Sequence, residues 1–252
     1  MNQHRPNGAE IRLLNVSGLQ IATRVQGEGD PLLLINGMTR PLQSWEPFTA
    51  ALSRRTIVSF DLPGVGGSPT SLLPLSIPAL AAIAAQVLDA AGLHDADVLG
   101  YSHGGAIAQH LAGNAADRVR RLVLAATSCG VGATPGPGLA GLRGLGRPAN
   151  GNASSYVDPR ALWWHSIAFS SWSSIPFLGA IKAPTLVVCG TRDRFVPPAN
   201  SRVLAGRIPD ARLVLLPAGH DLQRPESATA LARLVGEFLP AWRGTEPAAY
   251  SA

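Results

Sequence analysis

Short runs of apolar residues recur along most of the chain, separated by longer segments whose apolar residues return every third or fourth position. The short runs predict buried strands, and the longer periodic segments predict amphipathic helices. The predicted strands are residues 11–16, 19–25, 31–35, 56–60, 96–99, 121–126, 184–188 and 212–216. The predicted helices are residues 44–52, 77–91, 105–112, 200–207 and 226–239.

The order of these elements predicts the fold class. The first two strands form a predicted hairpin around Ser17 and Gly18, and strands then alternate with helices. This alternation is typical of an α/β protein with a mostly parallel, doubly wound sheet and helices on both faces. At 252 residues the chain is long enough for one such domain with a full core.

One long segment interrupts the alternation. Residues 130–155 are rich in Gly, Pro and Ala, and residues 159–181 carry several aromatic side chains. Loops of this length inside compact domains are usually functional or disordered. We interpret residues 131–183 as a small lid inserted into a core domain formed by residues 1–130 and 184–252. The alternative is an ordinary surface loop with no lid function.

The sequence Gly-Tyr-Ser-His-Gly at residues 100–104 lies between a predicted strand and a predicted helix. A serine in a Gly-x-Ser-x-Gly motif at such a junction sits on a tight turn, the nucleophile elbow, with its hydroxyl exposed. Ser102 is therefore the predicted nucleophile of an acyl-enzyme.

A serine nucleophile needs a base that takes its proton and a third group that orients the base. Asp193 and His220 each follow a predicted strand, so both fall at the sheet edge where sites form in open α/β sheets. The chain order serine, acid, histidine is that of an α/β-hydrolase sheet. Asp61 and Asp221 are the competing acids. We expect Asp221 to point away from its neighbour His220, and Asp61 to accept local backbone hydrogen bonds.

An acyl-transfer site also needs two N–H donors for the oxyanion. The backbone amide of His103, at the start of the serine helix, is one predicted donor, and that of Met38 is the other. The remaining predicted substrate contacts lie in the loop after the third strand and in the lid, where aromatic side chains would line an acyl pocket: Asn36, Thr39, Trp163, Trp164 and Trp172.

Composition and charge narrow the functional classes. The net charge is +5, but the arginines that carry it are scattered, which argues against a nucleic-acid partner. Neither metal-ligand spacing nor a phosphate-binding glycine fingerprint is present, so we predict no metal and no cofactor. No apolar run reaches the ~20 residues of a membrane span. Without a visible signal peptide, the prediction is a cytoplasmic protein in which Cys129 and Cys189 are buried free thiols. The oligomeric state stays open.

Several stretches carry a resemblance to a known family: LLLING (32–37), DLPGVGGS (61–68), GYSHGGAIAQ (100–109), RLVLAAT (121–127), KAPTLVVCGTRD (182–193) and RIPDARLVLLPAGH (207–220). Over residues 11–243 the chain resembles the α/β-hydrolase superfamily, and within it the intracellular poly(3-hydroxyalkanoate) depolymerases. The resemblance implies an α/β-hydrolase fold and hydrolysis of 3-hydroxyacyl esters through an acyl-enzyme. It also implies that Ser102, Asp193 and His220 form the catalytic triad.

These observations predict a serine hydrolase that cleaves a carboxylic ester of a moderately apolar acyl group, either a small molecule or an oligomer. The alternative keeps the fold but assigns thioester release, lactonisation or cyclisation in a biosynthetic pathway, because fold does not fix function. A third interpretation is a binding protein that uses the pocket without turnover. The complete chain order of serine, acid and histidine argues against it.

Overall fold

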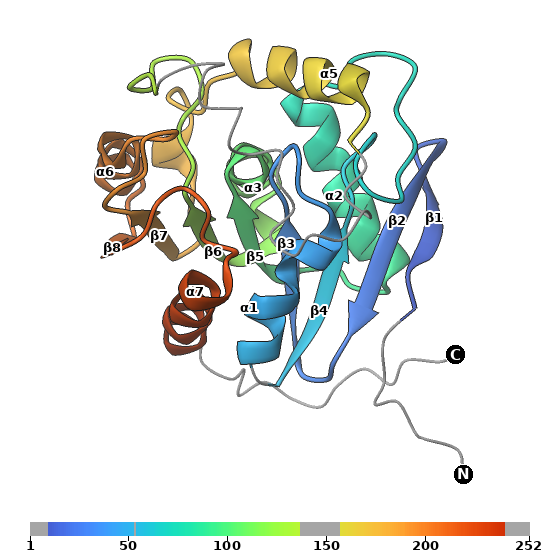
Figure 1. The fold of residues 1–252 in the computed structure, drawn as a ribbon, viewed down its shortest axis with the longest axis horizontal. Coiled ribbons are helices and arrows are strands. Elements are labelled where there is room, and N and C mark those ends of the chain that lie inside the picture. Colours follow the sequence, from blue (N-terminus) through green and yellow to red (C-terminus); the bar gives the residue numbers. More distant parts are fainter. Residues whose placement is uncertain (1–9, 53, 137–156, 240–252) are drawn as a thin grey trace.

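The computed structural model describes residues 10–52, 54–136 and 157–239. Eight strands form a sheet in the order β1-β2-β4-β3-β5-β6-β7-β8 (Figure 1). β1 and β2 pair antiparallel, as do β2 and β4, and all other neighbours are parallel. The strands are β1 (Arg12–Val16), β2 (Leu19–Gln26), β3 (Asp30–Ile35), β4 (Arg55–Phe60), β5 (Ala96–Tyr101), β6 (Val119–Ala125), β7 (Thr185–Gly190) and β8 (Ala211–Leu216).

Helices cover both faces of the sheet, which confirms the predicted fold class (Figure 1). The α-helices of the described residues are α1 (Glu46–Ala51), α2 (Ile77–Ala90), α3 (His103–Asn114), α5 (Pro159–Ser170), α6 (Pro198–Arg207) and α7 (Pro225–Phe238). Three short 3₁₀ helices are η1 (Leu42–Trp45), η2 (Ala116–Arg118) and η3 (Leu178–Ala180).

The apolar run in β3 shows why the sheet needs cover on both sides. Successive side chains of a strand point to opposite faces. Leu33 and Ile35 belong to the core cluster that includes α2, α3 and α6, whereas Leu32 and Leu34 belong to the cluster with α1 and α7. Burial of each side chain of this size stabilises the folded state by about 1.5–3 kcal/mol.

A buried ion pair joins the amino ends of β4 and β5. Arg55 Nη1 lies 2.8 Å from Asp97 Oδ2, and both side chains are almost fully buried. Arg55 also donates a hydrogen bond to the carbonyl of Leu239, the residue that follows α7. Arg55 therefore connects the end of α7 to the middle of the sheet.

The segment predicted as a lid is only partly described, because residues 137–156 lie outside the described residues. Its α5 packs on the loops that follow β3 and β4. His165 Nε2 lies 3.0 Å from the carbonyl of Pro63, and Ser166 Oγ lies 4.0 Å from the sulfur of Met38. This helix therefore covers the carboxyl ends of the central strands. The lid function stays a prediction.

Candidate active site

Ser102 occupies the sharp turn between β5 and α3. Its backbone has φ +53° and ψ −118°, a conformation that costs a non-glycine residue about 1–3 kcal/mol. The turn is possible because two neighbours are glycine: a Cβ on Gly104 would lie 2.2 Å from the carbonyl oxygen of Ile35, and one on Gly100 would lie 2.5 Å from that of Gly104. The hydroxyl of Thr127 donates to the Ser102 carbonyl at 2.7 Å and supports the turn from the segment that follows β6.

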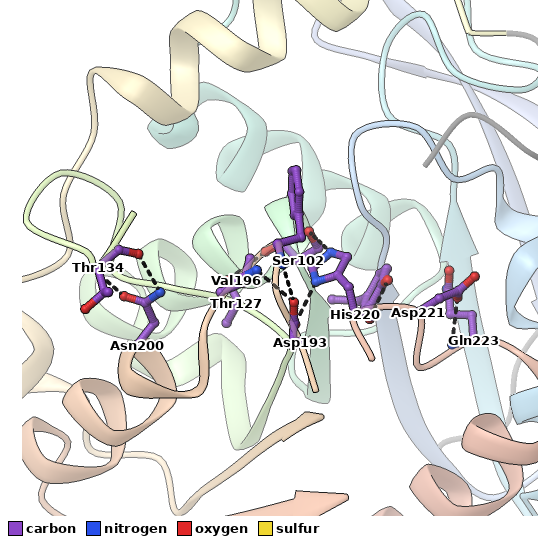
Figure 2. A network of polar contacts seen from close by, with 11 residues as sticks. Ser102, Thr127, Thr134, Asp193, Val196, Asn200, His220, Asp221 and Gln223 are labelled. Carbon is purple, nitrogen blue, oxygen red and sulfur yellow. Dashed lines mark hydrogen bonds and ion pairs between the residues drawn. The ribbon is translucent and has the colours of Figure 1, made fainter. Parts of the chain in front are cut away.

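The structure brings the three predicted triad residues together (Figure 2). His220 Nε2 lies 3.1 Å from Ser102 Oγ, and His220 Nδ1 lies 2.8 Å from Asp193 Oδ2. The other oxygen of Asp193 accepts the backbone N–H groups of Phe195 and Val196 at 2.9 and 2.8 Å. An ionised carboxylate only accepts, so Nδ1 of His220 carries a proton. Nε2 is then free to accept the serine hydroxyl.

Tyr101 and Phe195 hold the histidine, and neither was predicted from the sequence. The Tyr101 hydroxyl donates to the His220 carbonyl at 3.0 Å, and burial raises the pKa of this phenol, so it stays protonated and remains a donor. The ring of Phe195 lies 4.9 Å from the imidazole, centroid to centroid. Tyr101 occupies the variable second position of the serine motif, which carries no signal for such a role.

One predicted oxyanion donor directly follows Ser102 in the chain, and the other belongs to a residue that lines a cavity with Ser102. His103 is the first residue of α3, where backbone N–H groups have no acceptor within the helix. Met38 and Thr39 line a cavity of about 20 Å³ together with Ser102 and His220. A space of this size holds about one water molecule.

Asn36 is buried, and its amide is used within the protein. It donates to the carbonyl of Pro41 at 2.9 Å and accepts hydrogen bonds from the Gly37 amide at 3.1 Å and from Gln223 Nε2 at 2.8 Å. Asn36 therefore fixes the loop after β3 that carries the predicted oxyanion donor, and it links this loop to the one after β8.

The two competing acids are engaged elsewhere. Asp61 accepts the local backbone N–H of Gly67 at 2.8 Å, as predicted, and also that of Leu42 at 2.6 Å, which lies 19 residues earlier. Burial raises the pKa of this carboxyl to about 6. Asp221 points away from the imidazole (Figure 2). It forms an ion pair with Arg40 at 2.7 Å.

The three tryptophans named as substrate contacts have different environments. Trp163 is 62% exposed on the outer side of α5, and Trp164 is half-buried. Trp172 is buried in the main core cluster, with its ring 6.1 Å from that of Phe177. None of the three lines the cavity at Ser102 or the groove described next.

A groove of about 580 Å³ lies beside the small cavity. The two spaces share Arg40, Phe195 and His220, so the groove opens directly from the histidine side of Ser102. Three further arginines line it: Arg192, Arg194 and Arg224. Sequence reasoning missed this feature, because the arginines come from three separate loops.

Buried histidines lie on the other side of the elbow. The rings of His103 and His165 are 5.1 Å apart, and burial lowers the pKa of both imidazoles, which keeps them neutral. Within the described residues, no group of three or more His, Cys, Asp or Glu side chains could hold a metal ion. Cys129 and Cys189 are buried free thiols, as predicted. No helix among the described residues is long and apolar enough to cross a membrane.

Comparison with known proteins places the chain in a family. The model of the alpha/beta hydrolase fold matches residues 30–145 and 153–226, so the chain belongs to the α/β-hydrolase family. As predicted, it is an enzyme of the hydrolase class. It is 34% identical over 239 residues to a poly(3-hydroxyalkanoate) depolymerase of Ectopseudomonas oleovorans, covering 83% of this chain and 84% of the relative.

Two solved structures agree with this assignment. A hydrolase from Pseudomonas aeruginosa PA01 superimposes with a TM-score of 0.82 at 27% identity, over 93% of this chain and 100% of the other. The enol-lactonase from Burkholderia xenovorans LB400 superimposes with a TM-score of 0.77 at 26% identity, over 90% and 98%.

Proposed function

We propose that the chain hydrolyses carboxylic esters of a moderately apolar acyl group through an acyl-enzyme on Ser102. The observation that carries the proposal is the unbroken hydrogen-bond chain from Ser102 Oγ to His220 Nε2 at 3.1 Å and from His220 Nδ1 to Asp193 at 2.8 Å. Side chains so arranged can remove a proton from an alcohol while it attacks a carbonyl.

The reaction then has two halves. Ser102 Oγ attacks the ester carbonyl, and His220 takes the serine proton and passes it to the departing alcohol. Water enters, His220 takes a proton from it, and the attack of this water releases the acid and restores the serine. Asp193 keeps the imidazole oriented and stabilises its positive charge. The amides of Met38 and His103 hold the oxyanion in both halves, and the loss of one such donor typically costs ~2.7–4 kcal/mol of transition-state stabilisation.

The 3-hydroxyacyl esters are the proposed substrate class. Support comes from the poly(3-hydroxyalkanoate) depolymerase that matches 83% of the chain.

The test uses a chromogenic butyrate ester and an active-site label. We expect Ser102→Ala to abolish hydrolysis of p-nitrophenyl butyrate, and a fluorophosphonate to add its mass at Ser102 of the unmodified enzyme. The matched control is Ser17→Ala, which removes an exposed hydroxyl in the β1–β2 turn, hydrogen-bonded to Gln86. Hydrolysis that persists in Ser102→Ala would rule out the serine mechanism.

A further inference from the structure

The groove beside His220 is rich in positive charge. Four guanidinium groups line it, against only two carboxylates, those of Asp221 and Glu226. Asp221 is already shared, because Arg40 Nη2 lies 2.7 Å and Arg224 Nε 3.4 Å from its Oδ2. The carboxylate of Asp221 therefore lies between two guanidinium groups, and the lining of the groove keeps an excess of positive charge.

The other two arginines have no carboxylate partner among the described residues. Arg192 donates to the carbonyl of Pro217 at 2.6 Å, which fixes its side chain without neutralising its charge. Arg194 is exposed next to the triad acid in the sequence. α7 begins at Pro225, and Glu226 in its first turn also lines the groove, so this carboxylate offsets the positive end of the helix dipole there.

The groove lies on the side from which a leaving group departs. A departing alcohol or thiol takes its proton from His220, so its oxygen or sulfur must lie within hydrogen-bonding reach of the imidazole. The cavity at Ser102 has only about 20 Å³, too little for any substituent that the leaving group carries. The groove of about 580 Å³ starts at the same His220, Phe195 and Arg40.

We propose that the arginine groove binds an anionic substituent, a carboxylate or a phosphate, on the leaving group of the substrate. This inference rests on the proposed ester hydrolysis and narrows its substrate class. The bond that forms is between Ser102 Oγ and the acyl carbon, and the bond that breaks joins that carbon to the anionic alcohol or thiol, which leaves with the proton from His220. Arginine suits this role because its guanidinium matches the oxygens of both anions.

Two matched pairs of substrates test the proposal, and all four carry the same butyryl group so that acyl binding cancels. The carboxylate pair is 3-(butyryloxy)butanoate and its methyl ester. The phosphate pair is S-butyryl-4′-phosphopantetheine and S-butyryl-pantetheine. The measured quantity is the ratio of kcat/KM for the anionic member to that for its neutral partner, at low and at high ionic strength. The pair with the larger ratio identifies which anion the groove prefers.

We expect the anionic member to be favoured in at least one pair, and added salt to reduce the preference. In the double variant Arg194→Gln/Arg224→Gln this preference should fall about tenfold, because each exposed pairing contributes only modestly. Arg233→Gln is the control: it removes a similarly exposed arginine from α7, paired with Glu237 at 3.0 Å and outside the groove. Its ratio should equal that of the unmodified enzyme.

The outcomes separate the two proposals. If all four substrates are cleaved but neither pair shows a preference, or if the preference survives the double variant, the groove has no such role while ester hydrolysis stands. If the control lowers the ratio as much as the double variant, the preference reflects only the net charge, and the inference is refuted. If none of the four substrates, and not p-nitrophenyl butyrate either, is cleaved in a Ser102-dependent way, both the proposed function and the inference about the groove fail.

Discussion

Replacing Asp193 by asparagine tests the role of the acid without emptying its site. The carboxylate accepts three hydrogen bonds: two from the amides of Phe195 and Val196 at 2.9 and 2.8 Å, and one from His220 Nδ1 at 2.8 Å. Asparagine has one acceptor oxygen. We expect that oxygen to face the two amides, which turns the NH₂ group toward His220.

The imidazole must then accept at Nδ1 and carry its proton on Nε2, where it can no longer take the proton of Ser102. A wrong tautomer in such a triad lowers kcat by about 10⁴-fold, or about 5.5 kcal/mol. In Asp193→Asn the free energy of unfolding should fall by less than about 2 kcal/mol, because the side-chain oxygen still accepts the two backbone amides. Asp193→Ala leaves both amides without an acceptor and should cost about 2–6 kcal/mol of unfolding free energy.

The assay is kcat for p-nitrophenyl butyrate, measured beside urea unfolding of each variant. Asp210→Asn, which alters an exposed carboxylate in the turn before β8, is the control with the same charge change and should match the unmodified enzyme. The reasoning is refuted if Asp193→Asn keeps kcat within about tenfold of the original value.

Two further predictions concern stability, and a third concerns the turn at Ser102. Burial raises the pKa of Asp61 from 3.8 to about 6 in the folded state. Its contribution to the free energy of unfolding is therefore fully present below pH 3.8 and is lost as the pH rises through 6. Between pH 4 and 7 the free energy of unfolding of the unmodified enzyme should fall by about 2–3 kcal/mol relative to that of Asp61→Asn, as measured by urea titration at each pH. A difference between the two proteins that stays constant with pH would contradict this. Asp97→Ala leaves the Arg55 charge buried without its partner and should cost about 3–5 kcal/mol by thermal unfolding, whereas a loss below about 1 kcal/mol would show that the pair is solvated. Gly104→Ala puts a Cβ 2.2 Å from the Ile35 carbonyl oxygen, so fluorophosphonate labelling should disappear; normal labelling would mean that the turn relaxes.

The fold could be predicted from the sequence because its signals are local. Apolar runs such as residues 31–35 and 184–188 are buried on both faces, and such runs are typical of parallel strands. Convergence of Ser102, Asp193 and His220 also follows from this pattern, since each residue ends or follows a parallel strand of one sheet. Their catalytic roles stay predictions until they are measured.

Other parts of the site depend on long-range contacts that no local pattern encodes. Arg40 and Asp221 are 181 residues apart and meet only because β3 and β8 end at the same edge. An aromatic-rich segment predicts burial but not the direction of each ring. Trp163 therefore faces solvent while Trp172 enters the core, although both were expected to contact substrate.

The position of His220 after β8 has a consequence for the enzyme during its synthesis. A ribosome makes Ser102 early, but the base that would activate it follows 118 residues later, and β8 must still dock beside β7. Until then the nascent polypeptide holds an unactivated alcohol in a half-built sheet. With Ser102 and His220 in their proposed roles, translation delivers an inert precursor, and competence for acyl transfer arrives only when the tertiary structure is complete.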